Sequence, residues 1–420
     1  HYRNGRDLTD KPRGVLLIDL FGLDVDEVLA KFPAAYQHVL EHVKPERDAK
    51  ANTKDGAGYA RLWWLHGKPR QEMRKQLAGL TRYIATVETS KHRTFQFLSA
   101  EIAPDNMLIA VALDDAYFLG VLSSQTHAIW ALAAGARLGV GNDPRYNKTR
   151  CFEPFPFPAA DEAQATRIRD LAEHLDTHRK RQQAQHPDLT LTGMYNVLDK
   201  LRSGEPLTAK ERVIHEQGLV SVLRQLHDDL DAAVLDAYGW SDLLPLLRIA
   251  MGTDARVPRA QDAQERPHGN EPPTEGQTRD DAKRAFDDAI LERLVALNAE
   301  RAAEEARGHI RWLRLEFQNP QATNAPQQTE LETRATPDED TAPTAIHVGK
   351  PIAWPKDAVE QVRTVADLLA SSPVPLSLDE IGNRFTARGP WKKRLPQLVE
   401  MLVALGRAEI REGGVVGAGR

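Results

Sequence analysis

Residues 135–150 carry side chains that are well suited to touching a nucleic acid. These sixteen residues include three glycines, four basic residues, a tyrosine and two asparagines. Glycine lets a backbone bend close to a phosphate chain, and cations and amides can reach phosphates or base edges beyond it. We therefore predict that Arg145, Tyr146, Asn147, Lys148 and Arg150 contact DNA.

A second basic group follows a strand predicted over Thr81–Glu88. The stretch from Arg61 to Arg93 holds eight Lys and Arg residues and only two acids, a local charge of +6. Such a surface gains affinity by releasing counterions from phosphates. The alternative is a solvated basic face over a small core, as charge runs usually are. Because side chains on loops read base edges, we predict that Lys91, His92 and Arg93 form a second reading loop.

Regular elements must hold these two groups in place. Met107–Leu113 is an apolar run of strand length, and Ala116–Ala134 has the apolar spacing of a helix. Phe155-Pro-Phe-Pro158 cannot be helical inside, so it is predicted to leave the domain as an extended segment. At the start of the chain, Val15–Leu20 is predicted as a strand and Asp24 as the beginning of a helix.

The residues Asn4 to Asp7 support two interpretations. Asn-Gly and Asp are turn formers, so the segment can be purely structural. It can also be a hinge between this region and another domain, in which case Arg3 and Arg6 would face DNA.

Residues 159–251 are predicted to be a helical domain. A long helix is expected over Asp161–Gln185, and a capping box at Thr208 opens another that continues to Leu235. His174 and His178 are four residues apart, a spacing that lets one helix face present both imidazoles to a metal. Their neighbours are charged and a third ligand is missing, so a solvated pair is favoured.

The C-terminal third alternates linkers with folded segments. Residues 252–282 and 318–350 are rich in Pro, Gln and acids, which is typical of linkers, and they flank a helical segment at 283–317. Residues 351–420 are predicted to form three helices, the last over Trp391–Leu405, and a hairpin, as in a winged helix. Lys392, Lys393 and Arg394 would then be a second basic patch on DNA. Such units also dock proteins, so both roles stay open.

Bulk properties narrow the class of protein. The net charge of −5 gives no global case for nucleic-acid binding, so the case must be local. One cysteine excludes a disulfide framework and a cysteine-rich zinc site, and is typical of a reducing cytoplasm. No apolar run approaches ~18 residues without a charge, so no membrane span is expected.

Several of these stretches together resemble a known family. The strand, the helix with the sequence FLGVLSSQTHAIW, the glycine-basic loop and the EPFPFP exit resemble the target recognition region of large adenine-specific DNA methyltransferases. These enzymes occur in Type IIG restriction–modification and phage-defence systems. Tyr2–Asp7 with Val15–Asp19, and Asn298–Arg314, resemble the same family. The resemblance implies double-stranded DNA as a partner and S-adenosylmethionine as the cofactor of the whole enzyme.

The motifs of catalysis are not found in the sequence. A methyltransferase of this kind needs an Asn/Asp-Pro-Pro-aromatic motif, and the sole Asn-Pro is Asn319-Pro320, followed by Gln321. Gly139 and Gly141 follow a helix, the wrong context for a cofactor loop. No Glu-x-Lys of a nuclease occurs. We therefore expect a catalytic methyltransferase domain upstream of His1, with no metal or cofactor bound by this chain.

The sequence thus predicts a multidomain α+β protein. Residues 1–158 would form a mixed α/β target recognition domain, residues 159–251 a helical spacer, and residues 351–420 a winged-helix-like unit. The expected function is DNA target recognition for an adenine-N6 methyltransferase. The alternative is a scaffold that docks partner subunits of a phage-defence complex and has no catalysis of its own.

Overall fold

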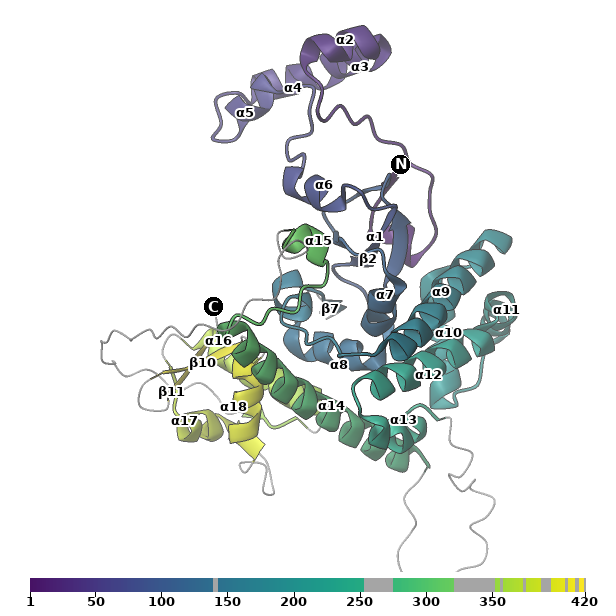
Figure 1. The fold of residues 1–420 in the computed structure, drawn as a ribbon, viewed down its shortest axis with the longest axis vertical. Coiled ribbons are helices and arrows are strands. Elements are labelled where there is room, and N and C mark those ends of the chain that lie inside the picture. The colour runs from purple at the N-terminus through teal and green to yellow at the C-terminus, as the bar shows by residue number, and fades with distance from the viewer. Residues whose placement is uncertain are drawn as a thin grey trace, which may run out of the picture.

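Helices make up most of the protein, and its strands form small separate sheets. The computed structural model describes residues 1–138, 143–252, 275–320, 352–355, 358–372, 375–386, 394–404, 407–411 and 415–418. Figure 1 shows a central body with a small helical projection at one end and a C-terminal unit at its side. This arrangement confirms the predicted mixed α+β class.

The central body is built on a three-stranded antiparallel sheet in the order β3-β2-β5. Its strands are β2 (Arg82–Val87), β3 (Gln96–Ser99) and β5 (Leu108–Val111). Both faces of β2 are covered, with Ile84 in one apolar cluster and Tyr83 and Ala85 in another. Both strands predicted here from apolar runs are confirmed, because a strand buried on both faces has a nearly continuous apolar sequence.

The N-terminal residues flank this sheet. Strand β1 (Tyr2–Arg3) pairs in parallel with β4 (Ala103–Pro104). Asn4 and Asp7 form a capping box at the start of α1 (Gly5–Thr9), each side chain accepting from the other's backbone N–H. The Asn-Gly-Arg-Asp segment therefore begins a helix, and its proposed role as a hinge stays a prediction.

A helical module projects from the sheet (Figure 1, top). Its helices are α2 (Val25–Lys31), α3 (Pro33–His42), α4 (Lys44–Ala49) and α5 (Gly56–Arg61), and α6 (Gln71–Leu77) follows at its base. The module has its own core around Val28, Val39 and Trp63, so Trp63 is a packing residue. The predicted strand Val15–Leu20 is wrong: these residues form no strand and lead from the sheet to the module, with Leu16 71% exposed.

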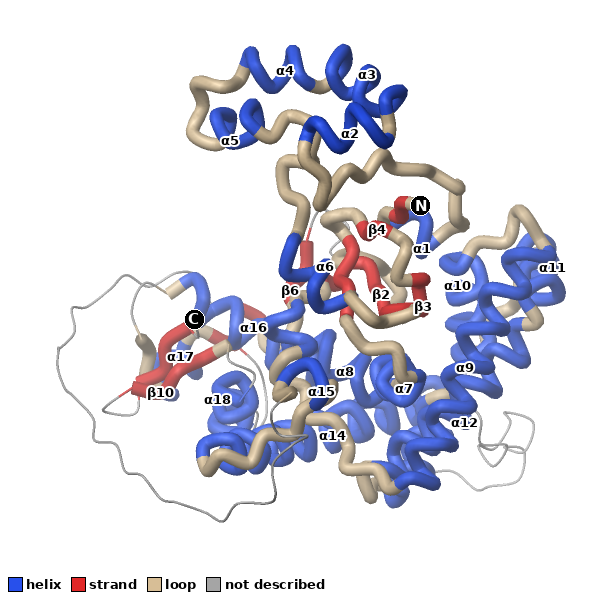
Figure 2. The backbone as a smooth tube through the Cα atoms, turned by 45° about the horizontal axis from the view of Figure 1, so that its top comes forward, coloured by secondary structure: helices blue, strands red, loops and turns tan. Residues whose placement is uncertain are grey.

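The helix predicted over Ala116–Ala134 is two helices, α7 (Ala116–Ser123) and α8 (Gln125–Ala134). Ser124 has extended backbone angles and accepts from the backbone N–H of His127, so it ends the first helix by capping the second. Gly120 lets α7 approach α9 (Glu162–Gln185), because a Cβ there would lie 2.5 Å from Ile168 Cγ2. Figure 2 shows α7 and α8 below the sheet, beside the long helices.

Residues 159–251 are helical, as predicted, and their assignment as a separate domain stays a prediction. Besides α9 they contain α10 (Leu191–Ser203), α11 (Ala209–Gly218), α12 (Val220–Ala237), the 3-10 turn η2 (Ser241–Leu243) and α13 (Leu244–Ala250). The capping box at Thr208 is confirmed. The single helix predicted to continue from it is wrong, because Leu219 adopts a left-handed φ of 43° and separates α11 from α12.

The chain beyond residue 252 packs back onto the body. Helix α14 (Glu275–Ala306) begins inside the segment predicted as a linker, and α15 (Leu315–Gln318) follows it. Asn298 donates a hydrogen bond of 2.5 Å to the carbonyl of Pro154. Arg314 donates to the carbonyls of Gln76 and Ala78 at the end of α6. The C-terminal half is therefore joined to the first domain by direct contacts.

The C-terminal unit contains three helices and a hairpin, as predicted. Its elements are β8 (Ile352–Ala353), α16 (Ala358–Ser371), α17 (Leu378–Asn383), β9 (Phe385–Thr386), α18 (Leu395–Ala404), β10 (Ala408–Arg411) and β11 (Val415–Ala418). The assignment as a winged helix stays a prediction. Within the described parts of the chain, no helix has the length and apolar character needed to cross a membrane.

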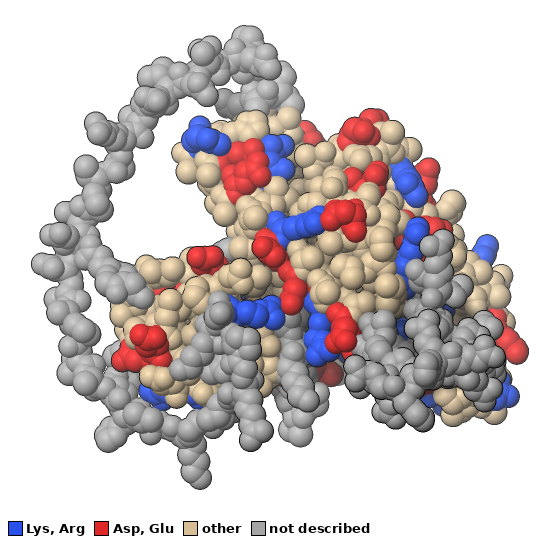
Figure 3. All heavy atoms as spheres, turned by 90° about the horizontal axis from the view of Figure 1, so that it is seen from below, with Lys and Arg blue, Asp and Glu red and all other residues tan. Residues whose placement is uncertain are grey.

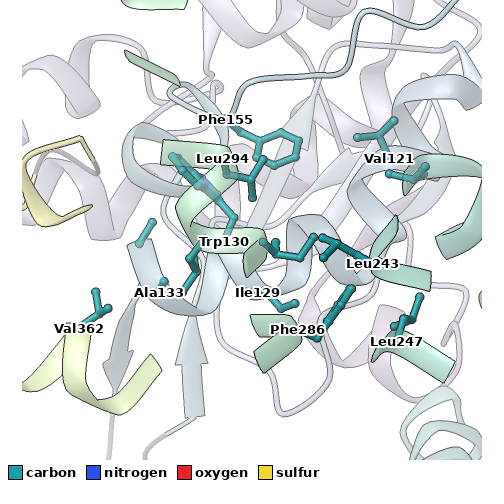
Figure 4. Packing of buried hydrophobic residues seen from close by; sticks show 14 of the residues in the cluster. Val121, Ile129, Trp130, Ala133, Phe155, Leu243, Leu247, Phe286, Leu294 and Val362 are labelled. Carbon is teal, nitrogen blue, oxygen red and sulfur yellow. The ribbon is translucent and has the colours of Figure 1, made fainter. Parts of the chain in front are cut away.

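One hydrophobic core joins these units. Trp130, Ile129 and Ala133 of α8 pack in the same buried cluster as Leu230 of α12 and Phe286 of α14. Figure 4 shows Phe155 of the Pro-rich exit beside Trp130, with Leu294 of α14 close to both. Helix α8 is therefore the element around which the recognition region, the helical domain and the C-terminal unit assemble.

Candidate nucleic-acid interface

The two basic groups predicted from the sequence lie in one place. Strands β6 (Ala136–Leu138) and β7 (Asp143–Arg145) form a hairpin, and Arg145 makes an antiparallel bridge with Thr89. The backbone N–H of Tyr146 donates to the carbonyl of Glu88 over 2.6 Å. The loop that carries Lys91 therefore lies against the hairpin. We call these segments, residues 88–95, 136–138 and 143–152, the paired loops.

Arg93 joins the two segments from inside. Its guanidinium donates to the carbonyls of Val87 and Glu88 on one segment and to that of Pro144 on the other, the last over 3.1 Å. It also lies 5.0 Å from the centre of the Tyr146 ring. Burial lowers its pKa to about 10, which leaves it charged at neutral pH. Arg93 holds the paired loops together, so we take it out of the set proposed to contact DNA.

Tyr146 also points inward. It is 1% exposed, and its hydroxyl lies 3.0 Å from Nε2 of the buried His127 on α8. Burial lowers the pKa of His127 to about 3, so the ring is neutral. Phe95 packs edge-on against both rings. Tyr146 therefore fixes the hairpin to α8, and we also take it out of the contact set.

The remaining predicted residues keep access to solvent. Lys148 is 69% exposed with Glu153 at 3.9 Å, and Arg145 is 41% exposed with its guanidinium 2.5 Å from Glu88. Asn147 caps the π-helical turn η1 (Lys148–Phe152) by accepting from Thr149. Arg150 is half-buried in the same turn. These four residues form the exposed polar edge of the paired loops.

Lys91 and His92 connect the paired loops to the helical domain. Lys91 Nζ and His92 Nε2 lie 2.6 and 2.9 Å from Oδ1 of Asn196 on α10. Arg179 of α9, which is 1% exposed, donates to the carbonyl of Phe95 over 2.7 Å. Lys91 itself is exposed and keeps its place among the candidate contacts, whereas His92 is mostly covered.

A glycine fixes where the hairpin leaves α8. A Cβ on Gly135 would lie 2.6 Å from the carbonyl oxygen of Ala131 and 2.7 Å from that of Arg145. Any larger residue would push the hairpin away from the helix. The glycines at 139 and 141 lie outside the described residues.

The other predicted cations lie elsewhere. Arg3 is in β1 with its Nη1 buried and without a hydrogen-bond partner, and Arg6 pairs with Asp10 over 3.1 Å. Lys392 and Lys393 lie outside the described residues. Arg394 forms an ion pair of 2.9 Å with Asp288 of α14, so it joins the C-terminal unit to the body. Since the structure describes only Arg394 of these three residues, the DNA-binding role of this second patch stays a prediction.

Much of the basic stretch from Arg61 to Arg93 is paired within the protein. Arg74 forms an ion pair with Asp19 over 2.8 Å, and Arg82 pairs with Glu173 of α9. Figure 3 shows a different face, seen from below, on which Lys and Arg are interspersed with Asp and Glu among uncharged residues. The local charge of +6 therefore exceeds the positive charge that is free to bind phosphates. This finding agrees in part with the alternative of a solvated basic face.

The histidine pair on α9 does not form a metal site. His178 is buried with Nε2 3.1 Å from the carbonyl of Gly218, while His174 lies in an open groove between α9 and α12. Among the described residues, no cluster of three or more His, Cys, Asp or Glu side chains is arranged to hold a metal ion. The prediction that both histidines are exposed to solvent is wrong for His178, because this side of α9 packs on α11.

Asp231 caps α8, the helix that leads into the paired loops. Its titration predicts how the free energy of unfolding depends on pH. Its Oδ1 accepts from the backbone N–H of Gln125 over 2.7 Å, and burial raises its pKa to about 7. The unfolded carboxyl has a pKa near 3.9, so the unfolded chain binds fewer protons between about pH 4 and pH 7. The contribution of Asp231 to stability is therefore full below about pH 4 and falls as pH rises to about 7, by up to ~1.4 kcal/mol per pH unit.

Asp231→Asn keeps the acceptor for Gln125 and removes this titration. We expect the variant to gain stability over the native protein as pH rises from about 4.5 to 7.5 in urea unfolding. The buried His127 and His227 have lowered pKa values and act in the opposite direction, but equally in both proteins. Parallel pH curves for the two proteins would contradict the assignment.

The paired loops are held in place by their buried polar side chains and by Gly135 at the start of the hairpin. Their exposed edge is basic. Residues 12–159 match the family model described as "MmeI, target recognition domain". This segment is therefore similar to target recognition domains of that kind, which confirms the resemblance found in the sequence for about a third of the chain.

The solved structure of the Type IIL restriction–modification enzyme MmeI in complex with DNA is similar to this chain at 20% identity, with a TM-score of 0.42. The match covers 57% of this chain and 28% of that one, so the chain spans less than a third of that enzyme. Among curated proteins none matches the chain.

Sequence reasoning missed several residues that build this site. Glu88, His127 and Gly135 hold the paired loops, and Asn196 receives Lys91 from another domain. Gly135 has a signal in the sequence, because a glycine directly after a helix often marks a C-terminal stop. The other three have none, since their partners are 19 or more residues away.

Proposed function

We propose that this chain selects a sequence in double-stranded DNA for a restriction–modification enzyme that methylates adenine at N6. The observation that carries the proposal is the target recognition domain at residues 12–159, which contains the paired loops with their exposed basic edge. Arg145, Asn147, Lys148 and Arg150, with Lys91, are the proposed contacts to phosphates and base edges. The enzyme would act in the cytoplasm as part of defence against phage.

Methyl transfer would be carried out by another domain of the parent protein. S-adenosylmethionine would supply the methyl group there. In the sequence Gly139 and Gly141 follow the helix at Gln125–Ala134, whereas a cofactor loop leads from a strand into a helix, and this supports placing the cofactor elsewhere in the parent protein. The contribution of this chain is to bind DNA and to orient the target base.

The first test is binding of the chain to mixed-sequence duplex across a salt series. Arg145→Ala combined with Lys148→Ala is expected to weaken binding and to lower the slope of log K against log salt by about 1 for each phosphate contact removed. The reason is that each neutralised phosphate releases condensed counterions.

Lys210→Ala with Arg212→Ala is the matched control, because both cations are exposed on α11, which lies at the edge of the body away from β7 in Figure 1. It removes the same charge and should leave the slope unchanged. Equal effects of the two double variants would refute the assignment. Absence of DNA binding at low salt, with salt-insensitive binding to a partner subunit, would favour the scaffold alternative.

A further inference from the structure

The C-terminal unit is packed against the helix that carries the paired loops. Val362, Val365 and Ala366 of α16 are buried in the cluster that contains Trp130 and Ala133 of α8. Figure 4 places Val362 on the side of α8 where Ala133 lies. The contact joins segments that are more than 200 residues apart in the chain.

A single arginine makes the polar part of this contact. Arg407 is 8% exposed, and its Nη1 donates to the carbonyls of Ala133 and Gly135, each over 3.3 Å. Its Nη2 donates to Asp367 of α16, also over 3.3 Å. The last carbonyls of a helix have no partners within the helix, and a cation there is favourable. Arg407 therefore closes the C-terminal end of α8.

The end of α8 determines where the hairpin begins. Gly135 is the residue after the helix, and its Cα lies against the carbonyl of Arg145, as the 2.7 Å approach of a built Cβ shows. Ala136 pairs with Arg145 in the hairpin register. A shift of the Gly135 carbonyl would therefore move β6, β7 and the proposed contacts on them.

The C-terminal unit itself offers little to DNA in the parts that the structure describes. Helix α18 has no Lys or Arg between Leu395 and Ala404, and its Leu398, Val399 and Leu402 are buried. Arg394 at its start is paired with Asp288. A helix with this composition lacks the cations that a groove-reading helix uses.

We propose that the C-terminal unit is a brace for the hairpin β6–β7, and that Arg407 is the positioning residue through which it sets the conformation of the paired loops. The effect on DNA selectivity rests on the proposed function, whereas the effect on the hairpin does not. The recognition site would then include a residue 262 positions after Arg145, outside the target recognition domain.

Arg407→Gln in the full chain tests the brace. Loss of the charged hydrogen bonds is expected to speed amide hydrogen exchange in residues 136–138 and 143–145 by about tenfold, with α9 and α12 unchanged. Arg394→Ala is the matched control, because it removes another cation that holds the same unit but does not contact α8. It should leave exchange in the hairpin as in the native protein.

A second readout separates positioning from general stability. The native chain would first be used to enrich a preferred site from randomised duplex. Arg407→Gln is expected to lose about tenfold in affinity for that site while its affinity for mixed-sequence duplex and its salt slope stay the same. A merely destabilised protein would lose both affinities together.

Unchanged exchange in the hairpin, or exchange that rises evenly through the whole chain, would overturn the brace. If Arg407→Gln does not fold, Arg407→Lys keeps the charge and should show a smaller rise at the same residues, and no rise would overturn the proposal. Failure of the native chain to bind DNA would refute the proposed function alone, since the exchange result stands without DNA.

Discussion

Trp130→Ala is expected to lower the free energy of unfolding by about 3–5 kcal/mol, the range for deleting a large buried aromatic. Trp130 is fully buried on α8, packs edge-on against Phe155 and belongs to the cluster that also holds Phe286 and Val362. The cavity would lie where three parts of the chain meet. Urea unfolding followed by circular dichroism measures the loss, and we expect the recognition domain and the helical domain to lose stability together.

Trp312→Ala is the matched control for this prediction. Trp312 is 37% exposed in the segment between α14 and α15, so its removal should change the stability by no more than about 1 kcal/mol. A similar loss for both tryptophan variants would show that α8 is not the centre of the core. Loss confined to one domain would show that the domains unfold separately.

Arg93→Ala is expected to remove DNA binding by the chain and to cost about 2–3 kcal/mol of stability. Its guanidinium is the donor for three backbone carbonyls, and loss of the charged donor leaves those acceptors without this partner. The paired loops would then be held mainly by the Thr89–Arg145 bridge and the Tyr146–Glu88 hydrogen bond, so the exposed Lys91 and Lys148 would lose their fixed relative positions. Fluorescence anisotropy with labelled duplex and thermal unfolding measure the two effects.

Arg93→Lys separates charge from geometry. It keeps the positive charge, but a lysine has no planar fork to reach acceptors on two segments. We expect it to lose most of the binding as well. Full binding by Arg93→Lys would show that Arg93 acts through its charge on DNA, and would return it to the contact set from which its internal hydrogen bonds removed it.

Elements set by short-range patterns were predictable. The capping box at Thr208, the long helix that ends at Gln185 and the strand β2 follow from neighbouring side chains, and the structure has them as expected. The wrong predictions concern breaks between helices and the pairing of strands. Gly218, directly before Leu219, is a local signal for the break between α11 and α12 that the prediction missed, and Val15–Leu20 has a strand's composition without a partner strand.

The candidate site was likewise predictable in part. The sequence placed exposed cations at Lys91, Arg145 and Lys148 on two loops, and the structure brings those loops together. It could not distinguish these cations from Arg93 or Tyr146, because residue type is the same whether a side chain faces solvent or interior. Burial of Arg93 depends on carbonyls that include Pro144, 51 residues further along the chain.

The sequence by itself therefore determined many local elements, the similarity of its first part to target recognition domains and the two loops that carry the basic residues. Only the tertiary structure decided which of those residues stay exposed, and that the C-terminal unit closes the end of α8 through Arg407. The physical reason is that helix caps and strand periodicity arise between near neighbours. The desolvation and pairing of a charge, by contrast, depend on groups that only folding brings within hydrogen-bonding distance.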